Sequence, residues 1–450
     1  MTFPRYPKYK DSGVEWLGEV PEHWSVKRLR FVAKMNPPKS EVSALPPETM
    51  VSFLPMEAIG DDGSLVLEAE RPLQEVLTGY TYFRDGDVTI AKITPCYENG
   101  KGAVMDGLRN GVGFGTTELI VVRPEQRETV AEFLHYMFVS QPFRQKGESH
   151  MYGAGGQKRV PDAFVEDFAA AIPSLLEQRQ VVDFLDRETA RIDALIAEQR
   201  RLMELLKEKR QAVISHAVTK GLNPDVPMKD SGIEWLGEVP AHWEITPVKH
   251  LAKMASGGTP SKERLDWWHG DVPWASSKDM KCEELSDTQD HLTTTALEEG
   301  AATLAPVGSV FIVVRGMILS HTFPVVVSLT PMAFNQDLKA LTAIPRMRQD
   351  YLAWLLRGTA KQTLARVDEA AHGTTVLRMD AWGLMPLPVP PLDEQEAIVR
   401  FLRVQLASLD SLSLDVEHAI DLLLERRTAL ISAAVTGQID VRQVGGDMAA

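Results

Sequence analysis

The sequence has few cysteines and no long apolar run, and each of these absences excludes a class of protein. Its two cysteines, Cys96 and Cys282, have no cysteine or histidine at metal-ligand spacing, so neither a disulfide framework nor a zinc site is expected. No run of about 18 apolar residues occurs, so no membrane span is expected. The first residues, MTFPRYPKYKDSG, lack the apolar core of a signal peptide. We therefore expect a cytoplasmic protein.

The sequence also has fewer basic than acidic residues, so its 450 residues carry a formal net charge of −14. A protein that binds nucleic acid without a partner is usually basic. The acidic balance therefore argues against a stand-alone nucleic-acid binder. Local positive patches, or a partner subunit, would have to supply the cationic surface.

One segment occurs twice in the chain. Residues 11–24 read DSGVEWLGEVPEHW and residues 230–243 read DSGIEWLGEVPAHW, so twelve of fourteen positions are identical at an offset of 219. A second repeated pair begins at Glu177 (EQRQVVDFLDRETARIDALI) and at Glu394 (EQEAIVRFLRVQLASLDSL), at an offset of 217. Between the repeated pieces lie two inserts, roughly 25–170 and 244–388, that share little sequence. Like frames around unlike inserts indicate one scaffold used twice.

The second repeated pair predicts two long helices, over 174–219 and 393–436, because neither stretch contains glycine or proline. Apolar residues recur at every seventh position and predict a coiled-coil seam. These residues are Leu185, Ile192, Leu206 and Val213 in the first helix, and Leu402, Leu409, Val416, Leu423 and Leu430 in the second. Flanking apolar residues widen each ladder into a stripe: Leu195, Ile196 and Leu202, and Leu406, Leu412 and Ile420.

The ends of both helices carry capping residues. Ser174 and Asp393 are expected to cap the starts, and Gly221 and Gly437 lie where the helices should end. Each helix would be about 65–70 Å long at about 1.5 Å per residue. Gln199 is polar within the first ladder and either fixes the register or is a solvated exception. A coil that dimerises two chains is the alternative, but duplication within one chain favours an intramolecular antiparallel pair.

Both inserts are predicted to be mixed α/β domains with many short strands. Strands are expected at 86–95, 101–106, 116–124, 308–316 and 323–329, and short helices at 130–138 and 351–358. Polar, glycine-rich loops occupy 98–102, 111–117, 152–159, 256–262, 276–281 and 372–375. Such loops suit base-edge reading, because they carry amide, hydroxyl and basic groups and glycine permits close approach to a groove. For any one loop taken alone, an ordinary turn is the favoured interpretation.

The candidate DNA-binding residues are the basic, amide and hydroxyl side chains of these loops. In the first insert they are Lys92, Asn99, Lys101, Gln157, Lys158 and Arg159, and in the second Thr259, Ser261, Lys262, Lys278 and Arg315. Asn335 and Gln336 contact a base or form a buried turn. Residues 266–269, DWWH, form either a stacking platform or, as we favour, buried aromatics under a loop.

Three motifs resemble parts of enzyme active sites, but their contexts in this sequence do not support a catalytic role. Residues 36–39 read NPPK, but an amino-methyltransferase motif needs an aromatic residue where Lys39 stands, to stack on a flipped base. The GVGFG at 111–115 is flanked by strands rather than opening a helix, so it is not a phosphate-binding loop. His23 and His242 lie between proline and tryptophan in the repeated frame, where packing of each insert against the helices is the expected role.

The chain resembles the specificity (S) subunit of type I restriction–modification systems. The resemblance covers nearly the whole sequence and rests on the duplicated DSGxEWLGEVPxHW and on EKRQAVISHAVTKG with its mate ERRTALISAAVTGQ. Within the inserts it rests on GDVTIAKITPCYENGKGAV, GVGFGTTELIVVRP, SGGTPSKERLDWWHGDVPWASSKDM and FNQDLKAL.

This resemblance implies a non-catalytic DNA-reading subunit with two target recognition domains joined by an antiparallel pair of long helices. Each domain would read half of a split, asymmetric site, and the helices would set the gap. The implied partners are double-stranded DNA, two methyltransferase (M) subunits that bind S-adenosylmethionine and methylate adenine, and restriction (R) subunits that use ATP and magnesium; no cofactor is expected on this chain. The implied domains are target recognition domains at 1–172 and 222–390, long helices at 173–221 and 391–442, and a flexible tail at 443–450.

Two rival functions remain open at this level. The chain is alternatively the specificity module of a single-chain nuclease–methyltransferase, whose catalytic domains this sequence lacks, or a scaffold that binds only proteins through its coil. A sequence-specific shift of duplex DNA in the presence of M would separate them, since the scaffold predicts none.

Overall fold

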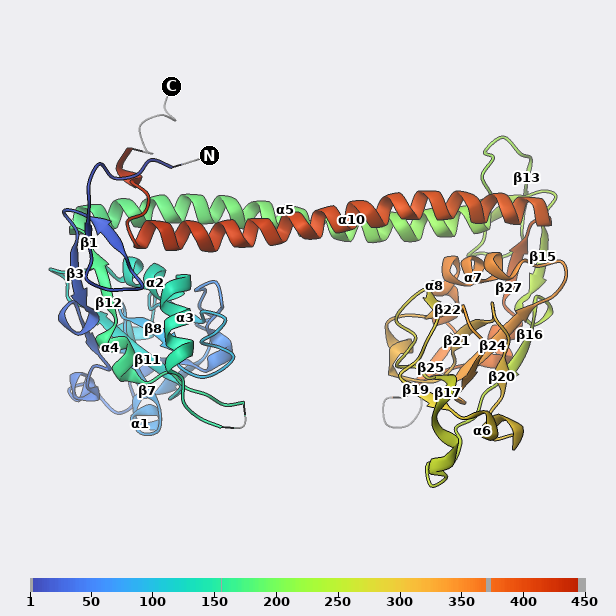
Figure 1. Ribbon diagram of the computed structural model, residues 1–450, viewed down its shortest axis with the longest axis horizontal. Helices are drawn as coiled ribbons and strands as arrows, with labels where there is room; N and C mark the ends of the chain where they lie inside the picture. The colour runs from blue at the N-terminus through green and yellow to red at the C-terminus, as the bar shows by residue number, and fades with distance from the viewer. Residues whose placement is uncertain (1–2, 155, 370–373, 444–450) are drawn as a thin grey trace. The chain divides into compact units, whose positions relative to one another are not determined.

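The computed structural model forms two compact units (Figure 1). Unit 1 consists of Met1–Arg200 and His418–Ala450, and unit 2 is Arg201–Glu417. The structure describes residues 3–154, 156–369 and 374–443. Parts of two predicted loops, residues 155 and 372–373, and the predicted tail beyond residue 443 lie outside the described residues.

Each repeated frame segment forms the same hairpin. In unit 1, β1 (Tyr9–Asp11) pairs with β2 (Glu19–Pro21), and in unit 2, β13 (Met228–Asp230) pairs with β14 (Glu238–Pro240). The Asp11 carboxylate accepts a hydrogen bond from the Gly13 amide at 2.9 Å, and Asp230 accepts one from Gly232 at 3.0 Å. Both glycines have φ near +70°, a left-handed conformation that glycine adopts without strain. The same DSG triplet therefore builds the same turn twice.

The insert of unit 1 folds into two four-stranded sheets and a flanking strand pair. One sheet has the order β6-β5-β10-β7: Glu70–Pro72, Met50–Leu54, Val112–Gly115 and Thr81–Arg84. The other has the order β4-β11-β8-β9: Ala33–Met35, Leu119–Pro124, Val88–Ala91 and Gly102–Val104. The flanking pair is β3 (Ser25–Arg28) with β12 (Ala169–Ile172). The helices are α1 (Leu73–Val76), α2 (Ala131–Val139), α3 (Gln141–His150) and α4 (Asp162–Asp167).

The insert of unit 2 has a five-stranded and a four-stranded sheet. The first has the order β16-β24-β21-β22-β18: Ala252–Ser256, Leu338–Ala343, Val310–Val313, Val325–Ser328 and Glu284–Leu285. The second has the order β19-β17-β23-β20: Asp290–Leu292, Trp268–Ala275, Met332–Phe334 and Leu304–Ala305. Two strand pairs complete it: β15 (Glu244–Pro247) with β27 (Pro386–Val389), and β25 (Val367–Glu369) with β26 (Thr375–Leu377). The helices are α6 (Thr294–Glu298), α7 (Gln349–Gly358), α8 (Ala360–Leu364) and α9 (Met379–Gly383).

The two inserts share a topology despite their unlike sequences. In each four-stranded sheet that contains a parallel pair, β5 with β10 or β17 with β23, an antiparallel strand lies on either side. The sheet β4-β11-β8-β9 likewise corresponds to the strands β16-β24-β21-β22, and neighbouring strands are antiparallel in both sets. In unit 2 this sheet has one additional strand, β18. The internal repeat therefore extends from the frame segments into the sheets of the two inserts.

The predicted strands and short helices occur where the sequence placed them, but the strands are shorter. The strand predicted at 86–95 is β8 alone, because Thr94 and Pro95 form a turn joined by a cis peptide bond. The helices predicted at 130–138 and 351–358 are α2 and α7. Burial explains the agreement, since β8 and β21 are buried along their full length.

Two long helices complete the chain, α5 (Leu175–Lys220) and α10 (Leu392–Val435). The Ser174 hydroxyl accepts a hydrogen bond from the Glu177 amide, so Ser174 caps α5 as predicted. Asp393 is not the cap of α10, because the helix already begins at Leu392. A glycine follows the end of each helix: Gly221 comes directly after α5 and Gly437 lies two residues beyond α10, with φ of +79° and +74°.

Within each unit the two helices lie side by side and antiparallel (Figure 1). In unit 1 the Arg427 guanidinium contacts Asp193 at 2.9 Å, and in unit 2 the equivalent Arg210 contacts Asp410 at 3.2 Å. Among the ladder residues, Leu185, Ile192, Leu206, Leu402, Val416 and Leu430 are buried, and Val213, Leu409, Leu423 and Gln199 are half-buried. Leu195 and Leu412, which were expected to widen the stripe, are exposed, so the seam is narrower than predicted.

The helices also belong to the core of each unit. In unit 1, Ile196 of α5 and Ile431 of α10 lie in one apolar cluster with the insert. In unit 2, Ile214 of α5 and Leu406 of α10 do the same. Each fully buried side chain of this kind contributes roughly 1.5–3 kcal/mol. The insert and the helix pair of a unit are thus one packed body. Among the described residues, no helix combines the length and apolarity needed to cross a membrane.

Candidate nucleic-acid interface

In unit 1 the predicted loops meet beside the end of β8. The Thr94 amide donates a hydrogen bond to the Lys158 carbonyl at 3.0 Å, and the Lys158 amide donates to the Thr94 hydroxyl at 3.1 Å. The Val160 amide donates to the Lys92 carbonyl at 2.9 Å. Backbone bonds therefore hold the segment around Lys158 against the segment that follows β8, although about 60 residues separate them.

The side chains of this loop cluster differ in their exposure and in their contacts within the domain. Asn99, Gln157 and Lys158 are exposed, and Lys92 is half-buried. Arg159 is engaged within the domain, since its guanidinium donates to the Glu118 carboxylate at 2.7–3.2 Å. These bonds, with a smaller contribution from Lys92, hold the pKa of Glu118 below its usual value. The carboxylate is therefore ionised at neutral pH and offsets the charge of Arg159.

Lys101 is also directed into its own domain. Its ammonium donates to the Met56 carbonyl at 3.3 Å and lies 3.8 Å from Asp61. Lys101 and Arg159 thus hold the loops in place through contacts within the domain, while Asn99, Gln157 and Lys158 present polar atoms outward. This division could not be predicted from the sequence, because Glu118 and Asp61 are remote along the chain from Arg159 and Lys101.

Unit 2 repeats the backbone arrangement with different residues. The Val314 amide donates to the Asp337 carbonyl at 2.8 Å, as Lys92 does to Glu118 in unit 1. The Leu377 amide donates to the Val314 carbonyl at 2.9 Å, as Val160 does to Lys92. Arg315 follows Val314 and is exposed. The two units therefore present structurally equivalent loops with unlike side chains.

A cavity of about 490 Å³ collects three of the five predicted residues of unit 2. Thr259, Lys262 and Lys278 line it, together with Leu265, Trp268, His269, Trp274, Ser276, Ser277, Asp290, Asn335 and Asp337. The Thr259 hydroxyl lies 2.6 Å from the Gln336 amide oxygen, and the Ser261 carbonyl accepts from the Trp268 indole at 3.1 Å. Ser261 therefore shapes the wall through its backbone, and Arg315 lies outside the cavity lining.

The aromatic segment packs against the insert. Trp267 and Trp268 are only half-buried, but both pack against an apolar cluster that contains Trp274 and Leu292. The favoured packing is therefore partly present, and stacking on a base stays a prediction. Trp267 carries the Arg264 guanidinium over its ring at 4.3 Å, and Trp268 meets Trp274 edge-on at 5.2 Å. β17 changes register between Trp268 and Val272, so strand periodicity alone does not predict the contact of Trp268 with Trp274.

Asn335 is mainly a turn-forming residue. Its amide oxygen accepts from the Asp337 amide at 3.1 Å, and its nitrogen donates to the Asp337 carboxylate at 3.3 Å. The side chain is buried but still borders the cavity. The buried turn is therefore present, and contact of Asn335 with a base stays a prediction.

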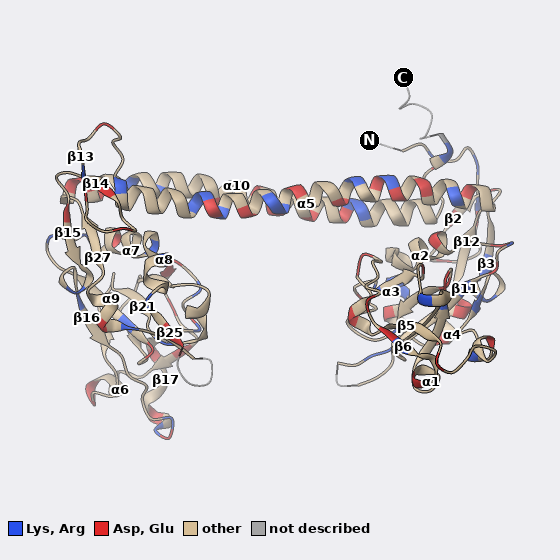
Figure 2. Cartoon of the chain, turned by 180° about the vertical axis from the view of Figure 1, so that it is seen from behind, with Lys and Arg blue, Asp and Glu red and all other residues tan. Residues whose placement is uncertain are grey.

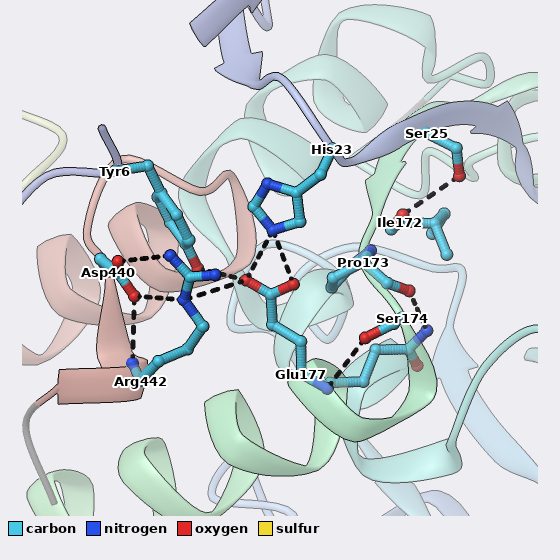
Figure 3. Close-up of polar contacts among 10 residues, drawn as sticks. Tyr6, His23, Ser25, Ile172, Pro173, Ser174, Glu177, Asp440 and Arg442 are labelled. Carbon is cyan, nitrogen blue, oxygen red and sulfur yellow. Dashed lines mark hydrogen bonds and ion pairs between the residues drawn. The ribbon is translucent and has the colours of Figure 1, made fainter. Parts of the chain in front are cut away.

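The repeated histidines tie each frame to the first turn of a long helix. His23 Nε2 lies 2.9 and 3.2 Å from the two carboxylate oxygens of Glu177, which is only 4% exposed (Figure 3). The Tyr6 hydroxyl donates to the same carboxylate at 2.8 Å, and burial together with this anion raises the pKa of Tyr6 well above its usual value. The Arg442 guanidinium pairs with Asp440 at 2.7 Å. It also lies 4.0 Å from the Glu177 carboxylate.

Unit 2 uses the same design. His242 pairs with Glu394, and the Trp243 indole donates to that carboxylate at 3.0 Å. Each pair joins a hairpin to a helix start, which indicates a positioning role. Among the described residues no group of three or more histidine, cysteine or acidic side chains could hold a metal ion.

Charges of both signs alternate along α5 and α10 (Figure 2). A surface that tracks a phosphate backbone is predominantly basic, whereas these helices carry both signs of charge.

Three kinds of comparison place the chain among known proteins. A family model described as the type I restriction modification DNA specificity domain matches residues 240–417. Over 166 residues the chain is 43% identical to the EcoAI specificity subunit of Escherichia coli, a match that covers 36% of this chain and 28% of that protein. It is 21% identical over 448 residues to the putative MjaX specificity subunit of Methanocaldococcus jannaschii, covering 95% and 96% of the two chains.

The EcoAI match therefore spans less than a third of that relative's length. Two solved structures share the fold. The HsdS subunit from Thermoanaerobacter tengcongensis superposes with a TM-score of 0.55 at 17% identity, covering 93% of this chain and 98% of the other. A chain from a structure of type I R-M complex assembly superposes with a TM-score of 0.72 at 18% identity, covering 92% and 98%.

Proposed function

The chain belongs to the specificity subunits of type I restriction–modification systems, and from this premise we propose that it is the non-catalytic subunit that reads a split, asymmetric DNA sequence. One observation carries the proposal: two domains of the same topology present unlike side chains on equivalent loops. Equivalent loops would approach equivalent parts of a groove, and unlike side chains would read different bases.

The residues proposed to touch DNA are those whose polar atoms face outward. In unit 1 these are Asn99, Gln157 and Lys158, with Lys92 beside them, while Lys101 and Arg159 position the loops. In unit 2 the proposed contacts come from Thr259, Lys262, Lys278 and Arg315, with Ser261 shaping the cavity wall. Amide side chains suit adenine edges, and basic side chains suit guanine or phosphate.

Two half-sites held at a fixed gap multiply their discrimination. A mismatched base pair costs about 1–3 kcal/mol, so a half-site of a few bases is too short to be rare. We assign the gap to α5 and α10, each of which contains residues of both units without a break in the helix. A one-pair slip both shifts and rotates the second half-site, so a stiff helix pair would reject it.

The chemistry is assigned to partner subunits. The net charge of −14 argues that this chain does not hold DNA alone. We propose that two M subunits bind S-adenosylmethionine and methylate adenine, and that R subunits use ATP and magnesium to cleave. This chain would direct both activities to one site.

The test is to combine the purified chain with its M partner and S-adenosylmethionine, methylate unmodified genomic DNA, and sequence the methylated bases at single-molecule resolution. We expect one asymmetric motif with two specified parts and a constant gap. A contiguous motif, or a variable gap, would overturn the proposal. A mobility shift of duplex DNA that requires both M and the motif would exclude the protein-only scaffold.

A further inference from the structure

The two units place a carboxylate at the same position of their sheets. The Lys92 amide donates to the Glu118 carbonyl at 2.8 Å, and the Val314 amide donates to the Asp337 carbonyl at 2.8 Å. Glu118 and Asp337 also stand directly before the equivalent strands β11 and β24. Asp337 is therefore the counterpart of Glu118, and the two acidic side chains can be compared directly.

In unit 1 a basic side chain from another segment pairs with the carboxylate. The Arg159 guanidinium donates to both oxygens of Glu118 at 2.7–3.2 Å. Arg159 is positioned there by an antiparallel β-bridge with Ile93, which follows the residue that pairs with the Glu118 backbone. The charge of Glu118 is thus offset within its own domain.

In unit 2 the residue that corresponds to this arginine is a valine. Arg315 forms the equivalent β-bridge with Val376, whose side chain cannot form an ion pair. Among the described residues, the side-chain partner of the Asp337 carboxylate is the Asn335 amide, which donates to it at 3.3 Å. A carboxylate has two oxygens and about four lone-pair sites. Asp337 is half-buried and therefore keeps acceptor sites for a ligand.

Asp337 lines the cavity of about 490 Å³ in unit 2, and two lysines line it as well. These are Lys262 and Lys278, and both are exposed. An acidic side chain close to DNA repels the phosphates, so it is tolerated there only where cations offset its charge. The cavity supplies those cations. It therefore combines a hydrogen-bond acceptor with donors of the opposite charge.

One base pair matches this combination in the major groove. Cytosine presents its N4 amino group there, and the paired guanine presents the O6 and N7 acceptors. Thymine presents the O4 acceptor, and in adenine the N7 acceptor lies beside the N6 amino group. A carboxylate is repelled by each of these acceptors. Cytosine is thus the base whose edge offers a donor without a neighbouring acceptor.

We propose that Asp337 is a specificity-determining residue whose carboxylate accepts a hydrogen bond from the N4 amino group of one cytosine in the half-site read by unit 2. The inference rests on the proposed function, because it requires duplex DNA at this cavity. Lys262 or Lys278 donates to the guanine of the same pair. Glu118, paired with Arg159, should make no such contact, so the two half-sites should differ at this position.

The first experiment measures methylation by the full-length chain with M and S-adenosylmethionine. The substrates are duplexes in which each base pair of the mapped motif is replaced in turn by the others. We expect one cytosine whose replacement slows the unaltered chain about 10-fold or more. Asp337→Asn should reduce that difference to within about threefold, because an amide donates as well as accepts and so tolerates adenine.

Asp271→Asn is the matched control. It makes the same change of charge at an exposed position on β17 that does not line the cavity. This variant should keep the base preference of the unaltered chain. Circular dichroism of each variant confirms that the chain is folded.

A second variant tests the assignment without removing the carboxylate. Val376→Arg places a guanidinium at the position of Arg159, where it should pair with Asp337 as Arg159 pairs with Glu118. We expect the same loss of cytosine preference. A chemical probe complements it: pyrimidin-2-one in place of the cytosine lacks the N4 amino group. This base should slow the unaltered chain about 10-fold and slow Asp337→Asn by less than about threefold.

Four outcomes would refute the inference. They are an equal slowing of all duplexes by Asp337→Asn, a motif in which no cytosine responds to this variant, no effect of pyrimidin-2-one on the unaltered chain, and transfer of the effect to Asp290→Asn, a change at another acidic residue of the cavity lining. In each case a split motif with a constant gap leaves the proposed function intact. A contiguous motif would instead overturn the proposed function itself.

Discussion

In each unit a buried glutamine side chain joins the insert to the start of a long helix. The Gln178 amide oxygen accepts from the Val130 amide at 3.0 Å, and its nitrogen donates to the Glu128 and Pro173 carbonyls at 2.8 and 3.0 Å. Gln395 repeats this with the Arg348 amide and the Arg346 and Pro390 carbonyls. Each side chain thus satisfies three backbone groups and fixes an insert to the start of a long helix.

Replacing either glutamine should destabilise only its own unit. Gln178→Leu leaves backbone groups around Val130 without partners, at a cost of about 1–3 kcal/mol for each group that stays buried. Hydrogen exchange read by mass spectrometry should show lost protection in unit 1, and Gln395→Leu should show it in unit 2. The control is Gln199→Leu on α5, where a half-buried amide should matter little. Uniform loss of protection in both units would contradict this reading.

His135 should make unit 1 sensitive to acid. Burial, reinforced by the nearby charge of Arg427, lowers its pKa to about 4. An unfolded chain protonates histidine near pH 6.5, so the folded state binds fewer protons below that value. The free energy of unfolding should therefore be fully present above about pH 6.5 and fall as the pH drops toward 4.

The measurement is urea unfolding of unit 1 across that range, followed by hydrogen exchange. His135→Asn should flatten the dependence between pH 6.5 and 4, whereas His250→Asn, at an exposed position, should preserve it. A profile unchanged by His135→Asn would show that other groups govern the acid response.

At the scale of elements, the heptad ladders make the helix pair extendable. Seven residues inserted after Arg200 in α5 and after Glu417 in α10 preserve the phase of both ladders. They lengthen each helix by about 10.5 Å, which is the rise of about 3 base pairs of DNA. We expect the gap in the methylated motif to grow by about 3 base pairs while both half-sites stay the same.

The control replaces those inserted residues with glycine and serine at the same two points. A flexible insertion has the same length but no fixed span, so the motif should lose its constant gap. If the helical insertion leaves the gap unchanged, the helices do not set the spacing.

At the scale of the whole molecule, the two inserts should act independently. Each insert has its own sheets and shares a core only with the helix segments of its own unit. Exchanging residues 25–170 for the insert of another family member should therefore change one half of the methylated motif and preserve the other half. The reciprocal exchange of 244–388 should change the opposite half. Alteration of both halves by one exchange would refute modular reading.

Sequence reasoning was strongest where local pattern governs structure. The heptads predicted helices at 174–219 and 393–436, and the observed helices are Leu175–Lys220 and Leu392–Val435. The duplicated frame predicted one scaffold used twice, and the structure shows the same hairpin in both units because its turn chemistry is contained in three adjacent residues. Periodicity and turn propensity act over a few residues, so a single chain reveals them.

Tertiary structure alone decided which distant residues meet. The sequence placed Arg159 among the candidate DNA-binding residues, but the fold pairs it with Glu118, 41 residues away. Phe184 and Phe401 occupy the same repeat position, but the fold packs Phe3 against Phe184 and leaves Phe401 37% exposed. Contacts of this kind depend on the path of the whole chain, because a side chain's charge and exposure are fixed by neighbours that the local pattern does not specify.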